Sequence, residues 1–160
     1  MSLTLMTDRF GLVSYMEDDI LFFPRGLPAF ERNQNWILIG DEENAIKWLQ
    51  NLEDGSLALP VTAPDAVLPD YNARIPEDEL EVVGSLNLAD LALLIVVSIP
   101  EAAPWDMTAN LRAPILLNLK KHRAVQVIAL NEEYPIRHVV FPDDVREAMK
   151  LQAVLAEENH

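Results

Sequence analysis

Residues 108–130 are the part of the chain that most constrains its fold. This stretch holds two short apolar runs, Ile115–Leu117 and Ala124–Leu130, separated by the polar residues Lys120–Arg123. Two strand-length apolar runs joined by a polar turn predict an antiparallel strand pair. Pro114 precedes the first run and has no backbone N–H to donate. The strand should therefore begin there, or be bulged or edge-placed at that point.

Two asparagines, Asn110 and Asn118, bracket the first run. An asparagine beside such a break can satisfy backbone groups that the ladder leaves unpaired, so a structural role is the first interpretation of both. The alternative interpretation is that the strand edge from Asn110 to Asn118, which also carries Leu111 and Pro114, faces a protein partner.

The other apolar runs are short, and prolines and glycines separate them. The runs that predict strands are 10–15, 20–23, 36–39, 56–61, 91–99 and 136–140. The first two should form a hairpin after a loose start over residues 1–8. Residues 91–99 are apolar on both faces, which is typical of a central strand. About eight short strands predict a mainly β, antiparallel barrel-like fold with a few short helices. We expect a single domain over 1–160, with its body at about 10–140.

The sequence predicts three helices, two of them from helical spacing. Apolar residues at i, i+3, i+4 and i+7 from Ala45 predict a helix that ends at Asp54-Gly55, with Trp48 in the core. Residues 77–84 can form a short helix. A third helix at about 143–157 carries a broad apolar stripe, which should dock on the body.

Two prolines and a glycine force residues 24–31 into an ordered turn. Gly26 and Pro28 shape this turn, and Leu27 and Phe30 are the large apolar side chains that it carries. The simpler interpretation is that both side chains plug the core beneath the turn. The alternative is that they contact a partner.

A proline-rich surface connection runs over residues 64–76. Tyr71 lies within it and should anchor it by burying its ring. Tyr71 is also a candidate partner-binding residue, because a tyrosine presents an apolar body and a polar tip.

Composition excludes several classes of partner. The 160 residues carry 12 Lys and Arg against 26 Asp and Glu, a net charge of −14, so phosphate backbones and anionic lipids should repel the chain. Direct binding to nucleic acid or to a membrane is not expected. There is no cysteine, which removes disulfides and thiolate chemistry and fits a reducing cytoplasm.

The sequence has no recognisable catalytic or metal-binding motif. It lacks a Gly-rich phosphate loop, G-x-S-x-G and H-E-x-x-H, and its three histidines are far apart. We therefore expect no catalytic residues, metal or cofactor. The alternative is a cytosolic hydrolase or isomerase with a carboxylate-based site on the barrel. A concave pocket with two converging carboxylates would favour that enzyme, and a flat apolar strip would favour a binding module.

Three blocks of the sequence resemble one known family. They are GLPAFE at Gly26–Glu31, LQNLED at Leu49–Asp54 and TANLRAPILLN at Thr108–Asn118. All three are similar to blocks of the flagellar assembly factor FliW family. Ala29 stands where that family usually has a second glycine, and alanine would be strained there if the position needs a positive φ.

The resemblance implies a small antiparallel β-barrel with helical additions and a cytoplasmic, non-enzymatic regulator. FliW-like proteins bind flagellin, and they bind the RNA-binding translational repressor CsrA as the alternative partner. When secretion lowers free flagellin, released FliW binds CsrA and relieves repression of flagellin translation. A body of charge −14 docked beside a basic RNA-binding surface would also disfavour phosphates there. A third possibility is the same scaffold with an unrelated protein partner.

Overall fold

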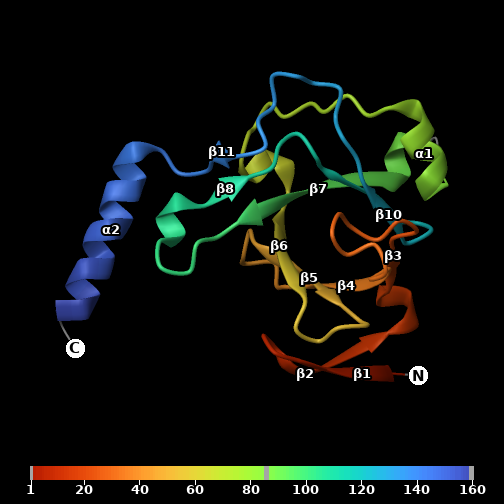
Figure 1. Ribbon diagram of the computed structural model, residues 1–160, viewed down its shortest axis with the longest axis horizontal. Coiled ribbons are helices and arrows are strands. Elements are labelled where there is room, and N and C mark those ends of the chain that lie inside the picture. The colour runs from red at the N-terminus through yellow and green to blue at the C-terminus, as the bar shows by residue number, and fades with distance from the viewer. Residues whose placement is uncertain (1, 85–86, 159–160) are drawn as a thin grey trace.

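A curled sheet forms the centre of the computed structural model, which describes residues 2–84 and 87–158 (Figure 1). In sheet order its strands are β11 (His138–Val139), β8 (Thr108–Ala109), β7 (Leu91–Ser98), β6 (Ala58–Thr62), β5 (Lys47–Asn51), β4 (Asn35–Ile39), β3 (Leu21–Phe22), β10 (Arg123–Gln126) and β9 (Ile115–Asn118). Strand β9 also pairs with β7, so the sheet closes on itself while β8 and β11 extend from the other end of β7. The predicted mainly β, barrel-like fold is confirmed.

The strand pair predicted around the polar turn is confirmed. Strands β9 and β10 are antiparallel, with Asn118 opposite Arg123 and Ile115 opposite Gln126. β9 begins directly after Pro114, as the missing N–H requires. β7 pairs with β6 and with β9, which confirms it as a central strand. The one parallel pairing among the described strands joins β3 to β10.

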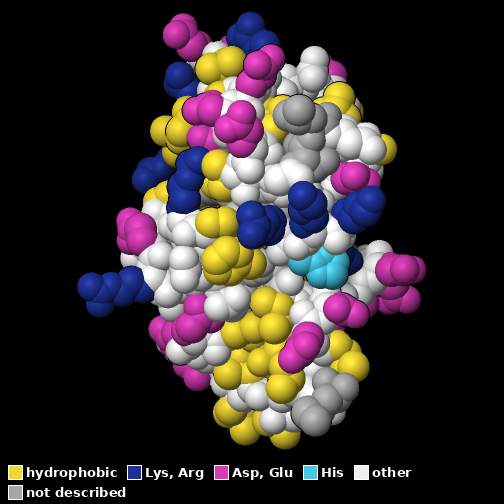
Figure 2. Space-filling view, turned by 90° about the vertical axis from the view of Figure 1, so that its right-hand side faces the viewer, with side chains coloured by type: hydrophobic (Ala, Val, Ile, Leu, Met, Phe, Trp, Pro, Cys, Tyr) yellow, Lys and Arg dark blue, Asp and Glu magenta, His cyan; other side chains and the backbone are white. Residues whose placement is uncertain are grey.

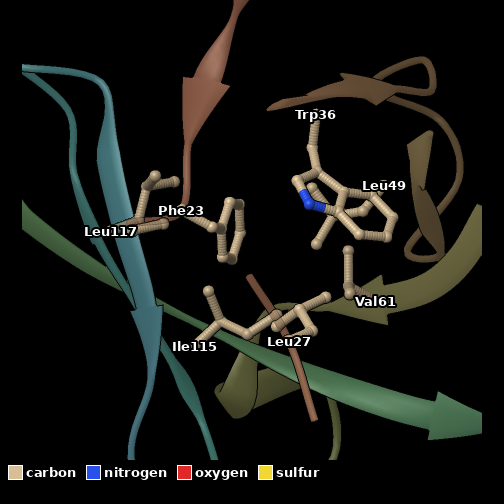
Figure 3. Close-up of a cluster of buried hydrophobic side chains, with 8 residues drawn as sticks. Phe23, Leu27, Trp36, Leu49, Val61, Ile115 and Leu117 are labelled. Atoms are coloured by element: carbon tan, nitrogen blue, oxygen red, sulfur yellow. The ribbon is translucent and has the colours of Figure 1, made fainter. Parts of the chain in front are cut away.

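Side chains from distant strands meet inside the closed sheet (Figure 3). Phe23, Trp36 and Leu49 have no exposed surface, and they point toward one another across the interior. Burying each such side chain contributes roughly 1.5–3 kcal/mol. Leu27 is buried in this cluster and Phe30 packs against it, so the prediction that the turn plugs the core is confirmed.

The helix predicted from Ala45 to the Asp54-Gly55 turn is wrong, because Lys47–Asn51 is strand β5. It pairs with β4 on one side and β6 on the other, and these ladders satisfy its backbone better than an isolated turn of helix would. Trp48 is half-buried rather than in the core. The guanidinium carbon of Arg9 lies 3.8 Å from its ring centroid.

The predicted loose N-terminus is also wrong. Strand β1 (Ser2–Thr7) pairs antiparallel with β2 (Gly11–Met16) in a separate two-stranded sheet. The predicted hairpin between 10–15 and 20–23 does not form, since β3 pairs with β4 and β10 instead. The Thr7 side chain closes the true hairpin: it donates to the carbonyl of Gly11 at 2.9 Å and accepts from the N–H of Phe10 at 2.9 Å.

Short helical segments cover the barrel. Helix α1 (Glu77–Val83) forms as predicted and ends at Gly84, whose φ is 78°. It packs Val83 against Leu116, Val125 and Val127. The 3-10 turns are η1 (Glu17–Asp19), η2 (Pro64–Ala66), η3 (Leu88–Asp90) and η4 (Pro104–Asp106).

Helix α2 (Asp143–Glu158) forms as predicted but does not dock on the body. Arg146 ties its first turn to Asp106, and beyond that turn the helix points away from the barrel (Figure 1). None of its described side chains is buried, and Leu151 is 60% exposed. The chain leaves the sheet at its edge strand β11, and α2 then meets the body at η4, where Arg146 pairs with Asp106. No helix in the described residues is both long and apolar enough to span a bilayer.

Candidate functional site

Two of the three sequence blocks meet at a groove on the barrel surface. Its volume is about 440 Å³, and no carboxylate lines it. The lining residues are Pro28, Asn110, Arg112, Ala113, Gln126, Ile128 and Ile136. The groove therefore joins the 24–31 turn to the segment before β9 and to residues 126–136, which begin at the last residue of β10.

Backbone hydrogen bonds and two residues with positive φ define the conformation of the 24–31 turn. Leu27 and Phe30 exchange two backbone hydrogen bonds, of 3.3 and 2.7 Å, and both side chains face the core. Gly26 has φ 60°, and a Cβ there would lie 2.4 Å from the Phe30 carbonyl oxygen. Ala29 has φ 72°, so this position does need a positive φ, as the comparison of motifs suggested. The turn thus holds Pro28 outward at the groove.

Asn110 organises the next wall of the groove. Its Oδ1 accepts hydrogen bonds from the N–H groups of Arg112 at 3.2 Å and Ala113 at 3.0 Å. The Gln126 side chain donates to the Ala113 carbonyl at 2.9 Å. Asn110 therefore satisfies backbone groups beside the Pro114 break, which is the structural role predicted for it.

Asn118 lies at the other end of β9 and does not reach the groove. It has no exposed surface, its Nδ2 donates to the Val83 carbonyl at 2.8 Å, and its Oδ1 accepts from Lys120 and Lys121, each at 3.0 Å. These bonds order the β9–β10 turn and hold it to α1. The structure does not bring Asn110 and Asn118 together.

Tyr71 and Leu111 are joined to each other inside the body. The Tyr71 hydroxyl donates to the Leu111 carbonyl at 2.8 Å, and its ring stacks on Tyr134 with centroids 4.8 Å apart. Burial, and secondarily the neighbouring Tyr134, raises the pKa of Tyr71 to about 12. Leu111 is 1% exposed. Both residues support the scaffold around the groove rather than line it.

Two buried polar residues of the Leu49–Asp54 block, Gln50 and Asn51, support the β5–β6 turn. The Nδ2 of Asn51 donates to the Asn35 carbonyl at 3.1 Å, and its Oδ1 accepts from Glu53 at 2.9 Å and Asp54 at 2.8 Å. Gln50 is fully buried, and its Nε2 donates to surrounding carbonyls, of which Asn51 is the nearest at 3.0 Å. This block closes the β5–β6 turn and lies away from the groove lining.

Sequence reasoning missed the apolar residues of the groove. Ile128 is 65% exposed and Ile136 is 63% exposed, while Val127 and Ala129 are buried. The sequence from 124 to 130 looks like one continuous apolar run, so the alternation beyond Gln126 was not predicted. Such large exposed aliphatic side chains beside a groove are typical of a protein-binding surface.

Metal binding or acid–base chemistry would need suitable side chains grouped together on the described surface. The described residues include no group of three or more His, Asp or Glu side chains placed to hold a metal. Five hollows on the described surface each have at most one carboxylate in their lining. None of them presents the two converging carboxylates that would have favoured a hydrolase or isomerase.

Comparison with known proteins gives one consistent match. The family model described as FliW protein matches residues 4–140, which ends before α2. The flagellar assembly factor FliW of Caldanaerobacter subterraneus subsp. tengcongensis is 37% identical over 141 residues, covering 87% of this chain and 93% of that protein. The Thermotoga maritima flagellar assembly factor FliW is 37% identical over 133 residues, covering 82% of this chain and 89% of that protein.

A solved structure shares the fold. A crystal structure of the flagellar assembly factor FliW superposes with a TM-score of 0.80 at 29% sequence identity. The superposition covers 88% of this chain and 99% of that chain. This chain and that flagellar assembly factor therefore share the same overall fold.

Proposed function

The chain belongs to the FliW family of flagellar assembly factors, and from that premise we propose that it binds flagellin and a CsrA-type translational repressor as alternative partners. When this chain binds the repressor, repression of flagellin translation is relieved. When it binds flagellin instead, the repressor is free to act again. Both partners meet this chain in the cytoplasm, where flagellin is made before export.

One observation supports a binding role most directly. The groove between the 24–31 turn and the segment before β9 has exposed Ile128 and Ile136 at its wall, and no carboxylate lines it although the chain carries a net charge of −14. A largely apolar groove with Arg112 as its one charged lining residue suits an apolar segment of a partner, because few charges must be desolvated when it is covered. We place both partners on this groove, since shared contacts explain why one excludes the other.

The charge of the body supplies a mechanism for antagonism. A partner docked in the groove has the acidic body of this chain beside it, and a basic RNA-binding surface there would repel incoming phosphates. The protein then acts on RNA through the repressor and does not bind nucleic acid itself. This mechanism needs no cofactor and no catalytic step.

Size-exclusion chromatography with the cognate partners tests the proposal. The chain mixed with CsrA, or with flagellin, should elute earlier as a complex, and a mixture of all three should contain the two separate complexes and no ternary one. Absence of a shift with either partner would contradict the proposed function and leave the fold untouched.

Two variants locate the binding surface. Ile128→Lys places a charge in the groove and should weaken both complexes by about tenfold or more, because it buries a charge at an apolar contact. Leu88→Lys is the matched control, since Leu88 is also a largely exposed aliphatic residue, at 76%, but lies on η3 away from the groove. If Ile128→Lys weakened only one complex, the partners would use different surfaces.

A further inference from the structure

The β1–β2 hairpin presents an uncharged face, with three large apolar side chains among Ser2, Thr4 and Ser14, that nothing in the described structure covers. Met6 is 65% exposed, Leu12 64% and Met16 46%, and all three lie on the same face, with Met6 directly opposite Leu12. Figure 2 shows hydrophobic side chains gathered at the lower end of the molecule, where Figure 1 places this hairpin. A two-stranded sheet is marginal by itself, so a third strand would add to its stability.

The hairpin also lacks the usual protection of an exposed edge. Neither Ser2–Thr7 nor Gly11–Met16 contains a charged residue or a proline, which are the devices that normally discourage strand addition. Within the described residues, no backbone group of Leu12–Tyr15 has a hydrogen bond outside the hairpin. The ladder of β2 can therefore accept a further strand.

Of the two edges, that of β2 is the open one. A Cβ added at Gly11 would meet nothing within 4 Å. By contrast, the backbone of β1 at Met6 lies against the β5–β6 turn, where a Cβ added at Gly55 would lie 2.3 Å from the Met6 carbonyl oxygen. The N–H of Asp8 also donates to the Gly55 carbonyl at 3.0 Å.

Charge is distributed unevenly along this edge. The three exposed acidic residues of η1, Glu17–Asp19, follow β2 directly, and Asp19 accepts a hydrogen bond from the N–H of Met16 at 2.8 Å. At the other end, Asp8 is followed by Arg9, whose charge lies over the Trp48 ring. The β2 edge thus carries no charged side chain along its length, with Leu12 and Met16 on either side of Ser14 on the exposed face, and it is acidic at the η1 end.

We propose that the β2 edge takes an extended segment of another protein by strand addition. The segment is about as long as β2, six residues, with apolar side chains at alternate positions and lysine or arginine at the end beside Glu17–Asp19. Its backbone pairs with Leu12–Tyr15, and its apolar side chains extend the face formed by Met6, Leu12 and Met16. A second copy of this chain is a poorer occupant, because it also has a net charge of −14 and the same acidic turn, so the two copies would repel each other.

This edge is independent of the proposed function. In Figure 1 the hairpin lies at the opposite end of the molecule from β11, and none of its residues lines the groove at Pro28 and Asn110. A partner on the β2 edge would leave that groove open.

Synthetic peptides test the proposal on the intact chain. The probe is a labelled strand peptide of about eight alternating valines and threonines ending in a pair of lysines. We expect it to bind and to slow amide hydrogen exchange at Leu12–Tyr15. The same peptide ending in glutamates should bind about tenfold more weakly. A peptide with a central proline, which cannot donate to the ladder, should not bind. Equal binding of the proline peptide would overturn strand addition.

Variants of the chain distinguish specific peptide binding at the β2 edge from non-specific binding. Leu12→Lys should abolish binding of the lysine peptide, and Leu88→Lys, the matched exposed leucine, should leave it unchanged. Glu17→Gln with Asp18→Asn should remove the preference for the lysine peptide over the glutamate peptide. Thermal melts confirm that each variant is folded. Peptide binding that survives Leu12→Lys, or a wild-type dimer in ultracentrifugation that Leu12→Lys dissolves, would overturn the proposal.

Discussion

The side-chain amide of Asn118 donates a 2.8 Å hydrogen bond to the carbonyl of Val83, and both residues are completely buried. Val83 is the last residue of α1, so this single bond links the end of the helix to the end of β9. The Asn118 oxygen at the same time accepts from Lys120 and Lys121. One side chain therefore satisfies three backbone groups that no strand or helix partner reaches.

Asn118→Ala should lower the free energy of unfolding by about 1–3 kcal/mol, because it leaves buried backbone groups without partners. Glu158→Ala, an exposed change on α2, is the control and should melt like the wild type. Thermal and urea unfolding of both variants measure the difference. If Asn118→Ala kept wild-type stability and lost a partner instead, Asn118 would be an interface residue rather than a structural one.

Ala29→Gly should stabilise the protein by about 0.5–1 kcal/mol, because a left-handed backbone strains alanine and not glycine. Ala29 is exposed with φ 72°, so no packing is lost with its methyl group. Gly26→Ala is the opposite test in the same turn: its φ is 60° and the new Cβ would lie 2.4 Å from the Phe30 carbonyl oxygen, so it should destabilise. A destabilised Ala29→Gly variant would contradict this account of the turn.

Tyr71 makes stability depend on alkaline pH. Its pKa is raised to about 12 in the folded protein, against about 10 in an unfolded chain, so folding favours the neutral phenol. This contribution is complete below about pH 10 and is lost as pH rises toward 12. Tyr71→Phe keeps the ring but loses the bond to Leu111, at a cost of about 1 kcal/mol below pH 10. Urea unfolding from pH 9 upward should show the wild type and Tyr71→Phe converging; a constant difference would exclude this role.

Antagonism of the repressor should weaken as salt rises, if the acidic body acts by repelling RNA. Screening shortens the field from about 8 Å at physiological ionic strength to about 3 Å at 1 M. RNA binding itself weakens with salt, so the quantity to compare is the ratio of RNA affinities with and without this protein at each salt concentration. Glu42→Gln with Glu43→Gln, which removes two exposed charges outside the groove, should lower the antagonism without loosening the complex. A ratio independent of salt would indicate steric exclusion instead.

The barrel could be predicted from the sequence wherever apolar runs and turn residues agreed. Pro114 fixed the start of β9, and the polar residues at 120–123 fixed its turn to β10. The prediction failed where long-range pairing overrode local spacing. Trp48 and Leu49 fit a helix by spacing, but the chain around them lies between β4 and β6, and no local signal reveals those neighbours.

The candidate site was only partly predictable for a related reason. Asn110 was a candidate partner-binding residue and lines the groove, whereas Pro28, which also lines it, was expected only to shape the turn. Ile128 and Ile136 were not candidates, because an exposed isoleucine and a buried one look alike in a sequence until the register of the strand is known. Helix α2 shows the same limit, since its apolar stripe predicted docking but not whether a face would be available.

The most direct test of the proposed function is RNA binding by the cognate CsrA, measured first alone, then with this protein, and then with flagellin added to the mixture. We expect this protein to lower the affinity of CsrA for RNA, and flagellin to restore that affinity by binding this protein in place of CsrA. The Ile128→Lys variant should lower the RNA affinity of CsrA less than the wild-type protein does, and Leu88→Lys should lower it as much as the wild type. An RNA affinity that this protein leaves unchanged, or one that flagellin fails to restore, would contradict the account.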